Sequence, residues 1–302
     1  GDWSSDVCSS DLTNTSHFDL NNVAAYEQWK QEKLTDYPSK LEDLVIEIKD
    51  PFSLTKGEKS EIISRCRQAN MVIYHTAKTW DENQPLLLSI MQQLGVTQLD
   101  HNLGAGEQGT SSLTPGGSAY ANFEKYIPYQ AKAIGWHTDG YYNAPDRQIQ
   151  TLTLYCQNES EEGGENDLLD HEIVYLLLRD KNPDYIRAFM QPDVMTIPAR
   201  MENGEVARPD RTGPVFSIIS GHLHMRYTAR TKSISWQQDE QTQVALKALE
   251  DILKNPLSYK FQGKLMSGWG LISHNVLHTR QAFKDNQQTR KLHRARFYDR
   301  MN

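Results

Sequence analysis

The sequence predicts a mostly β protein with flanking helices, because short β-type segments fill its second half and helical patterns are confined to a few stretches. Turns and insertions separate these segments, which is typical of a sandwich or barrel rather than a doubly wound sheet. The predicted strands cover residues 150–155, 194–198, 215–219, 222–228, 270–278 and 294–299. With 302 residues, the chain is long enough for one elaborated domain of this kind, which we expect over residues 13–302.

Residues 13–124 form the mixed α/β part of the predicted domain. Apolar residues recur there at helical spacing, and the predicted helices cover residues 20–34, 56–69 and 85–94. Gly95 is expected to end the last of them. A β-rich run at 71–75 predicts a strand. Residues 104–118 are rich in Gly, Ser and Thr, which predicts a long surface loop.

Two helical stretches interrupt the strands of the second half, at about 166–190 and at 240–253. The second carries a single apolar stripe, as a helix packed on a core does. Residues 1–12 differ from the rest, because they repeat Ser-Ser-Asp and have neither helical nor strand periodicity. We interpret them as a translated adapter or cloning remnant and exclude them from the predicted fold.

Composition argues against several functional classes. The net charge of −7 and the absence of a basic footprint make nucleic acid an improbable partner. The longest apolar run, Ile173–Leu178, is much shorter than the roughly 18 residues of a membrane span, and no cationic leader precedes it. Three widely spaced cysteines do not suggest a disulfide framework. The expected protein is therefore cytoplasmic.

Some patterns have simpler explanations than a functional site. Residues 104–109 match GxGxxG, but no suitable strand precedes them and no helix follows, so a turn-rich loop is the better interpretation. His222 and His224 share a face of a predicted strand without a carboxylate partner nearby in sequence. His274 and His278 share a face too, but on a strand they lie too far apart for one metal. No GxSxG motif supports a serine nucleophile.

An HxD pattern at His137 and Asp139 predicts a metal site. Residues two apart at the end of a strand project to the same side, so an imidazole nitrogen and a carboxylate oxygen can bind one ion. His278, on another strand-like run, can supply the third ligand. Two histidines and one carboxylate are the ligand set of non-haem Fe(II) oxygenases. A second HxD, at His17, is interpreted as a chance occurrence.

An oxygenase of this type needs two electrons beyond those of its substrate, which a 2-oxo acid can provide by losing CO2. A fixed cation must then hold the distal carboxylate of that acid. Arg290 follows His278 by twelve residues, and its planar fork suits a carboxylate. Arg294 and Arg296 lie on the same segment and remain alternatives. A solvated basic edge strand is the competing interpretation of all three.

Four motifs together resemble the taurine dioxygenase family of Fe(II)- and 2-oxoglutarate-dependent enzymes. They are WHTDG at 136–140, GGEN at 163–166, NVLHTRxxF at 275–283 and RKLHRA at 290–295. The resemblance covers most of residues 125–300, and the motifs follow the family's order. It implies a double-stranded β-helix, or jelly roll, as the core formed by residues 125–302.

The resemblance also implies roles for single residues. The implied iron ligands are His137, Asp139 and His278. Arg290 resembles the arginine that pairs with the distal carboxylate of 2-oxoglutarate, and Arg294 stands where relatives often contact an anionic group of the substrate. The family commonly has a threonine after the paired glycines, where this chain has Asn166. The amide of Asn166 can donate the same hydrogen bond to the co-substrate.

Looser similarity to glutarate 2-hydroxylases appears at 163–173 and 224–230. It implies a small carboxylic acid or amino acid as substrate, with Arg294 or Arg226 as its anchor. Tyr141, Tyr142 and Asn143 directly follow the HxD motif, and they and the 104–118 loop are candidates for the pocket wall. Ordinary aromatic packing explains the two tyrosines equally well.

The predicted reaction is hydroxylation of an unactivated C–H bond with Fe(II), 2-oxoglutarate and O2, releasing succinate and CO2. The carboxylate of Asp139 favours hydroxylation over halogenation, since it occupies the coordination position that a halide would take. One alternative is a hydrolase that uses zinc in the same site, which would leave Arg290 unexplained. A second is a non-catalytic jelly-roll binding protein, which has no reason to retain all three ligands. A homo-oligomer is compatible with the sequence.

Overall fold

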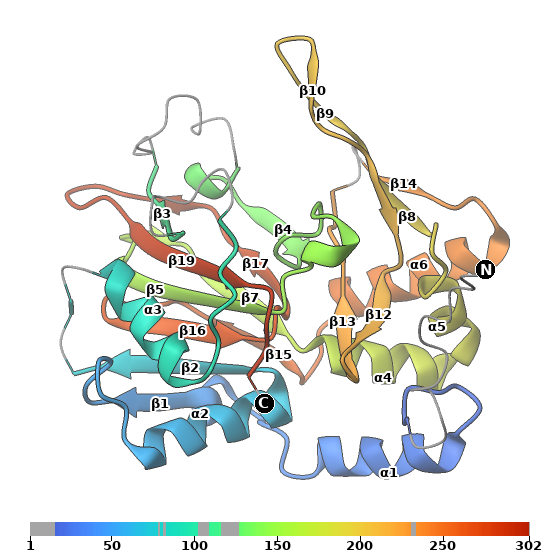
Figure 1. The fold of residues 1–302 in the computed structure, drawn as a ribbon, viewed down its shortest axis with the longest axis horizontal. Coiled ribbons are helices and arrows are strands. Elements are labelled where there is room, and N and C mark those ends of the chain that lie inside the picture. The colour runs from blue at the N-terminus through green and yellow to red at the C-terminus, as the bar shows by residue number, and fades with distance from the viewer. Residues whose placement is uncertain are drawn as a thin grey trace, which may run out of the picture.

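Two β sheets make up much of one half of the computed structural model, which describes residues 16–77, 79–80, 83–101, 109–115, 127–230 and 234–301 (Figure 1). The larger sheet has the order β1 (Val45–Ile48), β2 (Met71–Thr76), β16 (Trp269–Ser273), β5 (Thr151–Asn158), β19 (Lys291–Phe297) and β3 (Ser111–Leu113). The smaller has the order β15 (Lys260–Gly263), β7 (Asn166–Leu169), β17 (Leu277–Arg280) and β4 (Ile134–His137). The predicted mostly β fold with flanking helices is confirmed.

Apolar side chains from both sheets form one of the cores. Leu154 of β5 and Leu271 of β16 belong to the same buried cluster as Leu168 of β7 and Phe261 of β15. Alternate residues of a strand point to the same face of its sheet, so these side chains come from the two faces that the sheets turn toward each other. Burying these side chains holds the two sheets together, at about 25 cal/mol for each Å² of apolar surface removed from water.

Helices α2 (Lys56–Ala69) and α3 (Asn83–Gln93) cover the larger sheet, packing against a second core that contains Tyr74, Tyr155 and Ile272. A capping box formed by Thr55 and Glu58 starts α2, and Asn70 ends it in a left-handed conformation, with φ of 56°. Both helices, and the strand at 71–75, are therefore confirmed close to their predicted bounds.

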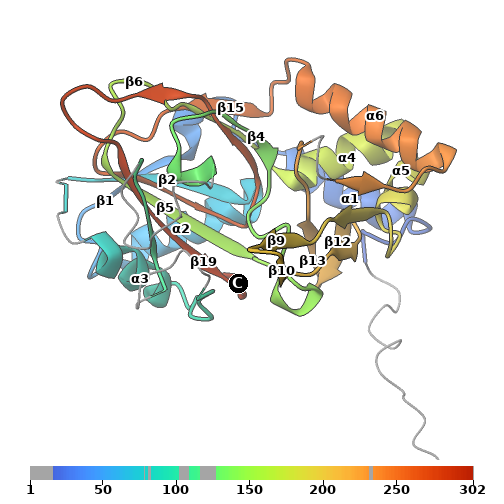
Figure 2. The ribbon, with the colours of Figure 1, turned by 90° about the horizontal axis from the view of Figure 1, so that it is seen from above.

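Helices gather at the other side of the molecule (Figure 2). They are α1 (Val23–Leu34), α4 (His171–Lys181), α5 (Pro183–Phe189) and α6 (Glu240–Lys254). They share a third core with strands β8 (Met195–Ile197), β12 (Phe216–Ile219) and β13 (His222–Met225). The predicted apolar stripe of α6 faces this core through Ala245, Ala248 and Leu249.

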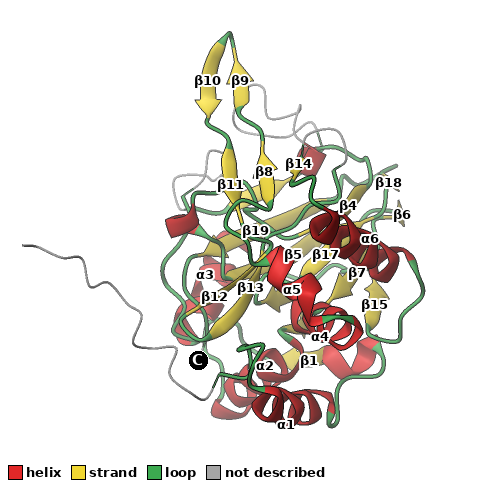
Figure 3. Cartoon of the chain, turned by 90° about the vertical axis from the view of Figure 1, so that its right-hand side faces the viewer, coloured by secondary structure: helices red, strands yellow, loops and turns green. Residues whose placement is uncertain are grey.

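A hairpin of β9 (Arg200–Glu202) and β10 (Glu205–Arg208) projects from this half of the molecule, as Figures 1 and 3 show. At its base the hairpin continues into β8 on one side and into β11 (Arg211–Gly213) on the other. Strand β8 pairs with both β11 and β14 (Ser235–Trp236). The described residues also form β6 (Glu162–Gly163), β18 (Phe283–Lys284) and the short 3-10 helices Leu41–Leu44, Ile127–Tyr129 and Pro145–Arg147.

The structure corrects the single strand predicted at 270–278. Residues 269–273 form β16 in the larger sheet and residues 277–280 form β17 in the smaller one. The break lies at Asn275, whose φ of 54° is left-handed and therefore incompatible with a continuous strand. The consequence is functional, because the crossing between sheets brings His278 beside β4.

Two other predicted segments also differ. Residues 166–169 of the predicted helical stretch form β7, because they pair with β15 and β17, and the helices begin only at His171. Within the predicted loop 104–118, residues 111–113 form the edge strand β3 against β19. Residues 1–12, most of the GxGxxG match and the other parts of that loop lie outside the described residues. In the described part of the chain, no helix is long and apolar enough to cross a membrane.

A buried ion pair joins α1 to the start of α4. The Lys33 ammonium lies 2.7 Å from the Asp170 carboxylate and 2.5 Å from that of Glu172, and all three side chains are at least nine-tenths buried. Asp170 also caps α4 by accepting the Glu172 N–H and accepts a hydrogen bond from the Asn70 amide. Removing the Lys33 charge would leave both carboxylates buried without this counter-charge.

Replacing Lys33 by methionine is therefore expected to lower the free energy of unfolding by about 3–5 kcal/mol. Urea denaturation measures this loss. The matched control is Lys30→Met on the same helix, because Lys30 pairs with Asp180 and Glu27 at the surface, where such pairs contribute about 1 kcal/mol or less. Equal losses in the two variants would contradict the assigned role of the buried pair.

Candidate metal centre

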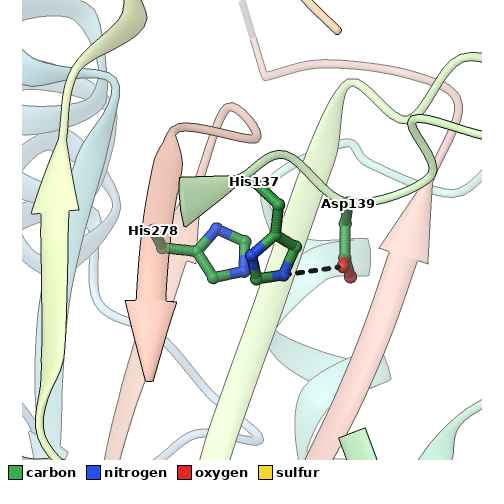
Figure 4. A group of neighbouring side chains, drawn as sticks. All are labelled: His137, Asp139 and His278. Carbon is green, nitrogen blue, oxygen red and sulfur yellow. Dashed lines mark ion pairs between the residues drawn. The ribbon is translucent and has the colours of Figure 1, made fainter. Parts of the chain in front are cut away.

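The three predicted metal ligands meet at one point of the smaller sheet. His137 closes β4 and is the direct partner of His278 in the antiparallel pairing of β4 with β17. Asp139 follows two residues later, and its Oδ1 lies 4.0 Å from His137 Nε2. The candidate ligand atoms of the three residues all lie within 4.8 Å of one another (Figure 4). The sheet register thus assembles a site from residues 141 positions apart in the sequence.

Both imidazoles are oriented to present Nε2 to an ion. His137 Nδ1 lies 2.9 Å from the Gly135 carbonyl and His278 Nδ1 lies 3.0 Å from that of Val276. A carbonyl only accepts, so Nδ1 carries the proton and Nε2 keeps its lone pair. Burial lowers the pKa of both histidines, that of His137 to about 3. The rings are therefore neutral, as metal ligands must be.

The Asp139 carboxylate is held in its charged form. Burial alone would raise the pKa of Asp139, but the positive charges of Arg294 and Arg296 bring it below its usual range. Arg294 Nη1 lies 3.2 Å from Asp139 Oδ2. Two neutral imidazoles and one carboxylate are the donor set that suits non-haem Fe(II), so these residues fit the metal predicted from the sequence.

Asn275 fixes the backbone of Asp139, a role that the sequence did not reveal. Its side chain accepts the Asp139 N–H at 2.7 Å and donates to the carbonyls of Asp139 and Ile149 at 2.9 and 2.8 Å. The residue is buried. Asn275 does lie in the same sequence motif as His278, but no rule of sequence spacing connects Asn275 with Asp139.

We expect Asn275→Gly to weaken iron binding about 10- to 100-fold, the usual effect of losing a group that orients a metal ligand. Glycine is the informative substitution, because it accepts the left-handed φ of 54° and removes only the three hydrogen bonds. Titration with Fe(II) under anaerobic conditions measures the affinity. An unchanged affinity would show that Asp139 is positioned without Asn275.

The three candidate arginines of the C-terminal segment differ in their partners. Arg290 is 4% exposed, its guanidinium carbon lies 4.8 Å from the centre of the Phe283 ring, and no described residue forms an ion pair with it. By contrast, Arg296 pairs with Asp100 at 2.5 Å and donates to the Tyr142 hydroxyl. A buried, unpaired guanidinium requires an anion, which favours Arg290 over the alternatives.

The paired glycines and Asn166 lie near these groups. Gly164 has a left-handed φ of 83°, and a Cβ atom there would lie 2.6 Å from Ser160 Oγ and in ordinary contact with Arg290 Nε, at 3.5 Å, so a side chain would clash with Ser160 beside Arg290. Asn166 and His278 line one cavity between the two sheets. Asn166 Nδ2 donates to the Thr279 carbonyl at 2.6 Å, and its Oδ1 is buried without a partner. Its contact with the co-substrate stays a prediction.

The predicted substrate residues lie around the loop after β4. The rings of Tyr141 and Tyr142 contact each other edge to face, with centres 5.2 Å apart. Asn143 closes the turn, because its N–H donates to the Gly140 carbonyl and its amide donates to that of Arg147. Arg226 is buried and donates to the carbonyls of Met195 and Arg211. Their contact with a substrate also stays a prediction.

The other histidines of interest lie outside the three-residue cluster. His274 Nδ1 hydrogen-bonds with the Asn70 side chain, and His224 Nε2 lies 3.2 Å from the Ile149 carbonyl. His17 stacks on Trp29. The buried, hydrogen-bonded His224 agrees with the structural role that the sequence suggested for it, and neither His17 nor His222 belongs to the described three-residue cluster.

A two-histidine, one-carboxylate site in a mostly β fold defines a class of non-haem iron oxygenases. The family model "Taurine catabolism dioxygenase TauD, TfdA family" matches residues 82–296, and the chain belongs to this family. The resemblance inferred from the motifs is confirmed, and so is the predicted class of enzyme, a dioxygenase, at the level of the family.

Several known proteins are similar to this chain. A uridine-5'-phosphate dioxygenase from Streptomyces sp is 28% identical over 189 residues, covering 61% of this chain and 66% of its own length, slightly under two thirds. The structure of asparagine oxygenase with Fe(II), 3-hydroxyasparagine and succinate has a TM-score of 0.58 at 13% identity, covering 81% of this chain and 80% of its own. The oxygenase OrfP with iron and α-ketoglutaric acid also has a TM-score of 0.58, at 16% identity, covering 92% and 91%.

Proposed function

We propose that this protein catalyses the Fe(II)- and 2-oxoglutarate-dependent hydroxylation of a small acid. The observation that carries the proposal is the cluster of His137, Asp139 and His278 in the protonation states that ferrous iron requires. Iron and α-ketoglutaric acid bound in a structure of the same fold support these two cofactors. O2 is the third member of the proposed set of cofactor and co-substrates.

Specific residues would hold each group. His137, Asp139 and His278 would hold iron, the Arg290 guanidinium would pair with the distal carboxylate of 2-oxoglutarate, and the Asn166 amide would donate to it. Bound together, iron, 2-oxoglutarate and O2 supply the oxidising power that hydroxylates a C–H bond, with succinate and CO2 as the other products.

The chain itself contributes orientation and charge. Hydrogen bonds to Gly135 and Val276 keep the proton of each imidazole on Nδ1, away from the ion. Arg294 keeps Asp139 ionised, and Asn275 fixes its backbone. The cavity beside His278 is lined largely by leucines, including Leu154, Leu168 and Leu271, which restrict the access of water.

The proposed substrate is a small carboxylic or amino acid, or another small anion. Asparagine and arginine derivatives occupy two of the structural neighbours, and one relative is named for a nucleotide. Arg294 and Arg226 are the candidate anchors, and Tyr141, Tyr142 and Asn143 the candidate wall. Because the matched region spans only 66% of the nucleotide enzyme, its substrate is one candidate among these acids.

The jelly-roll core, the domain bounds and the cellular location are also part of this proposal. We propose that the two sheets are the halves of a double-stranded β-helix. Strands β4 and β17 of the smaller sheet carry His137 and His278, and β19 of the larger sheet carries Arg294 and Arg296. Residues 13–302 would form one domain, which acts in the cytoplasm without nucleic acid or membrane and is compatible with a homo-oligomer.

A screen for succinate release tests the function. The iron-loaded protein with 2-oxoglutarate and O2 is incubated with amino acids, dicarboxylic acids, sulfonic acids and nucleoside monophosphates. We expect one class to stimulate succinate formation and to gain one oxygen atom. Hydrolysis of a test compound without succinate would favour the zinc hydrolase, and the absence of either reaction would favour a binding protein.

A further inference from the structure

The projecting hairpin carries an unusual arrangement of charge near its base. Arg208 of β10 is the direct partner of Arg200 of β9 across the antiparallel pair. Like charges directly opposite each other destabilise a sheet. At the tip, Glu202 and Glu205 oppose each other in the same way, so the charges are segregated along the hairpin instead of alternating across it.

A third arginine joins this pair. Burial, together with the positive charges of Arg200 and Arg211, lowers the pKa of Arg208 from its ordinary value. Glu202 pairs with Arg200 at 3.3 Å, but no described carboxylate pairs with Arg208 or Arg211. The buried Nε of Arg211 has no hydrogen-bond partner among the described residues. Among the described residues, the guanidinium groups of Arg208 and Arg211 therefore have no carboxylate to balance their charge.

Backbone contacts fix this cluster in place. Arg208 donates to the carbonyls of Pro198 and Pro209 at 2.7 and 3.0 Å. Arg226, buried behind it, donates to the Arg211 carbonyl at 3.0 Å and so holds β11. The Arg208 guanidinium and the backbone of Arg211 are thus ordered before any ligand binds, which reduces the entropic cost of binding.

The cluster adjoins the metal centre through Tyr142. The Arg208 guanidinium lies 5.9 Å from the centre of the Tyr142 ring, and Arg296 donates to the hydroxyl of the same tyrosine at 3.0 Å. Tyr142 follows the predicted ligand Asp139 by three residues. Figures 1 and 2 show the hairpin next to the loop that follows β4. A molecule bound at the metal centre could extend past Tyr142 toward these arginines.

We propose that Arg200, Arg208 and Arg211 bind an oxyanion of the substrate, a phosphate ester or a carboxylate. This inference rests on the proposed function, because it assigns the place of the substrate's acid group. Guanidinium forks match the oxygens of both anions, and several forks together suit a dianion best. Binding would relieve the repulsion between the facing arginines, and Arg226 would support the subsite from behind.

Calorimetric titration of protein loaded with Fe(II) and 2-oxoglutarate, without oxygen, tests this subsite. The probes are uridine 5'-monophosphate, its uncharged counterpart uridine, and glutarate. We expect at least one of the two acids to bind, and its affinity to fall about 10- to 100-fold in Arg208→Gln and in Arg211→Gln, the range for losing a hydrogen bond to a charged group. Uridine should bind more weakly than its phosphate if the phosphate is the anion. Preferential loss of glutarate binding would identify a carboxylate instead.

Arg187→Gln is the matched control, because Arg187 pairs with Asp184 on α5 away from the metal centre. The Arg211 side chain forms no hydrogen bond with a described residue, so Arg211→Gln should retain the parent's melting temperature. Unchanged affinities in both hairpin variants, or no binding of either acid to the parent protein, would overturn the proposal.

The same titration on metal-free protein separates the two proposals. The effect of the hairpin arginines should persist without iron, because none of them belongs to the metal cluster. Failure of the proposed function would appear instead as failure of the loaded protein to form an iron–2-oxoglutarate complex. An affinity that depends on iron but not on Arg208 or Arg211 would count against the subsite alone.

Discussion

Replacing His278 by alanine is expected to abolish iron binding and to lower turnover by more than about a hundredfold. Even the loss of a group that only orients a metal ligand costs about 10- to 100-fold, and His278 is itself a predicted ligand. Its Nε2 has no substitute, since the other described histidines lie outside the cluster. Iron content and succinate formation measure the two effects.

The matched control is His222→Ala. His222 is a partly exposed histidine of β13 and does not belong to the metal cluster. It should keep iron and activity close to those of the parent. An active, iron-containing His278→Ala protein would remove His278 from the site and, with it, the ligand set on which the proposed function depends.

Replacing Arg290 by leucine is expected to raise the 2-oxoglutarate concentration needed for half-maximal activity by about a hundredfold. Removing one partner of a buried, hydrogen-bonded charge pair costs about 2–5 kcal/mol, and leucine supplies neither charge nor donor. Iron binding should survive, because Arg290 contacts none of the three predicted ligands in the structure. Steady-state kinetics and iron titration of the same preparation separate these effects.

Arg147→Leu provides the comparison, because Arg147 is a largely exposed arginine that contacts Tyr298. It should not change the 2-oxoglutarate requirement. If Arg290→Leu also leaves that requirement unchanged, Arg294 or Arg296 must hold the co-substrate. Arg296 would then have to release Asp100, with which it is paired in the structure.

Much of the fold was predictable because local patterns decide it. The helix at 56–69 has a capping box at one end and a left-handed asparagine at the other, so local signals set both of its ends. The strand error at 270–278 has a different cause. The residues on both sides of Asn275 are buried, with apolar pairs at 271–272 and 276–277, and only the pairing partners reveal that the two sides belong to different sheets.

The three residues of the candidate metal cluster could be chosen from the sequence because the chemistry expected of them is specific. His137 and Asp139 are two residues apart, and His278 lies in a motif that the family shares. Partners that act through the backbone, such as Asn275, were not predictable, since their role depends on a contact across 136 positions. The pairing of the hairpin arginines was not predictable for the same reason, since only the strand register places Arg200 opposite Arg208.

The most direct test of the proposed function is the visible spectrum of the protein after anaerobic addition of Fe(II) and 2-oxoglutarate. Chelation of iron by the 2-oxo acid should give a weak metal-to-ligand charge-transfer band, which is absent with Fe(II) alone and absent in His278→Ala. No band at saturating 2-oxoglutarate, in protein that retains its fold, would contradict the assignment of His137, Asp139 and His278 as the site of this chemistry.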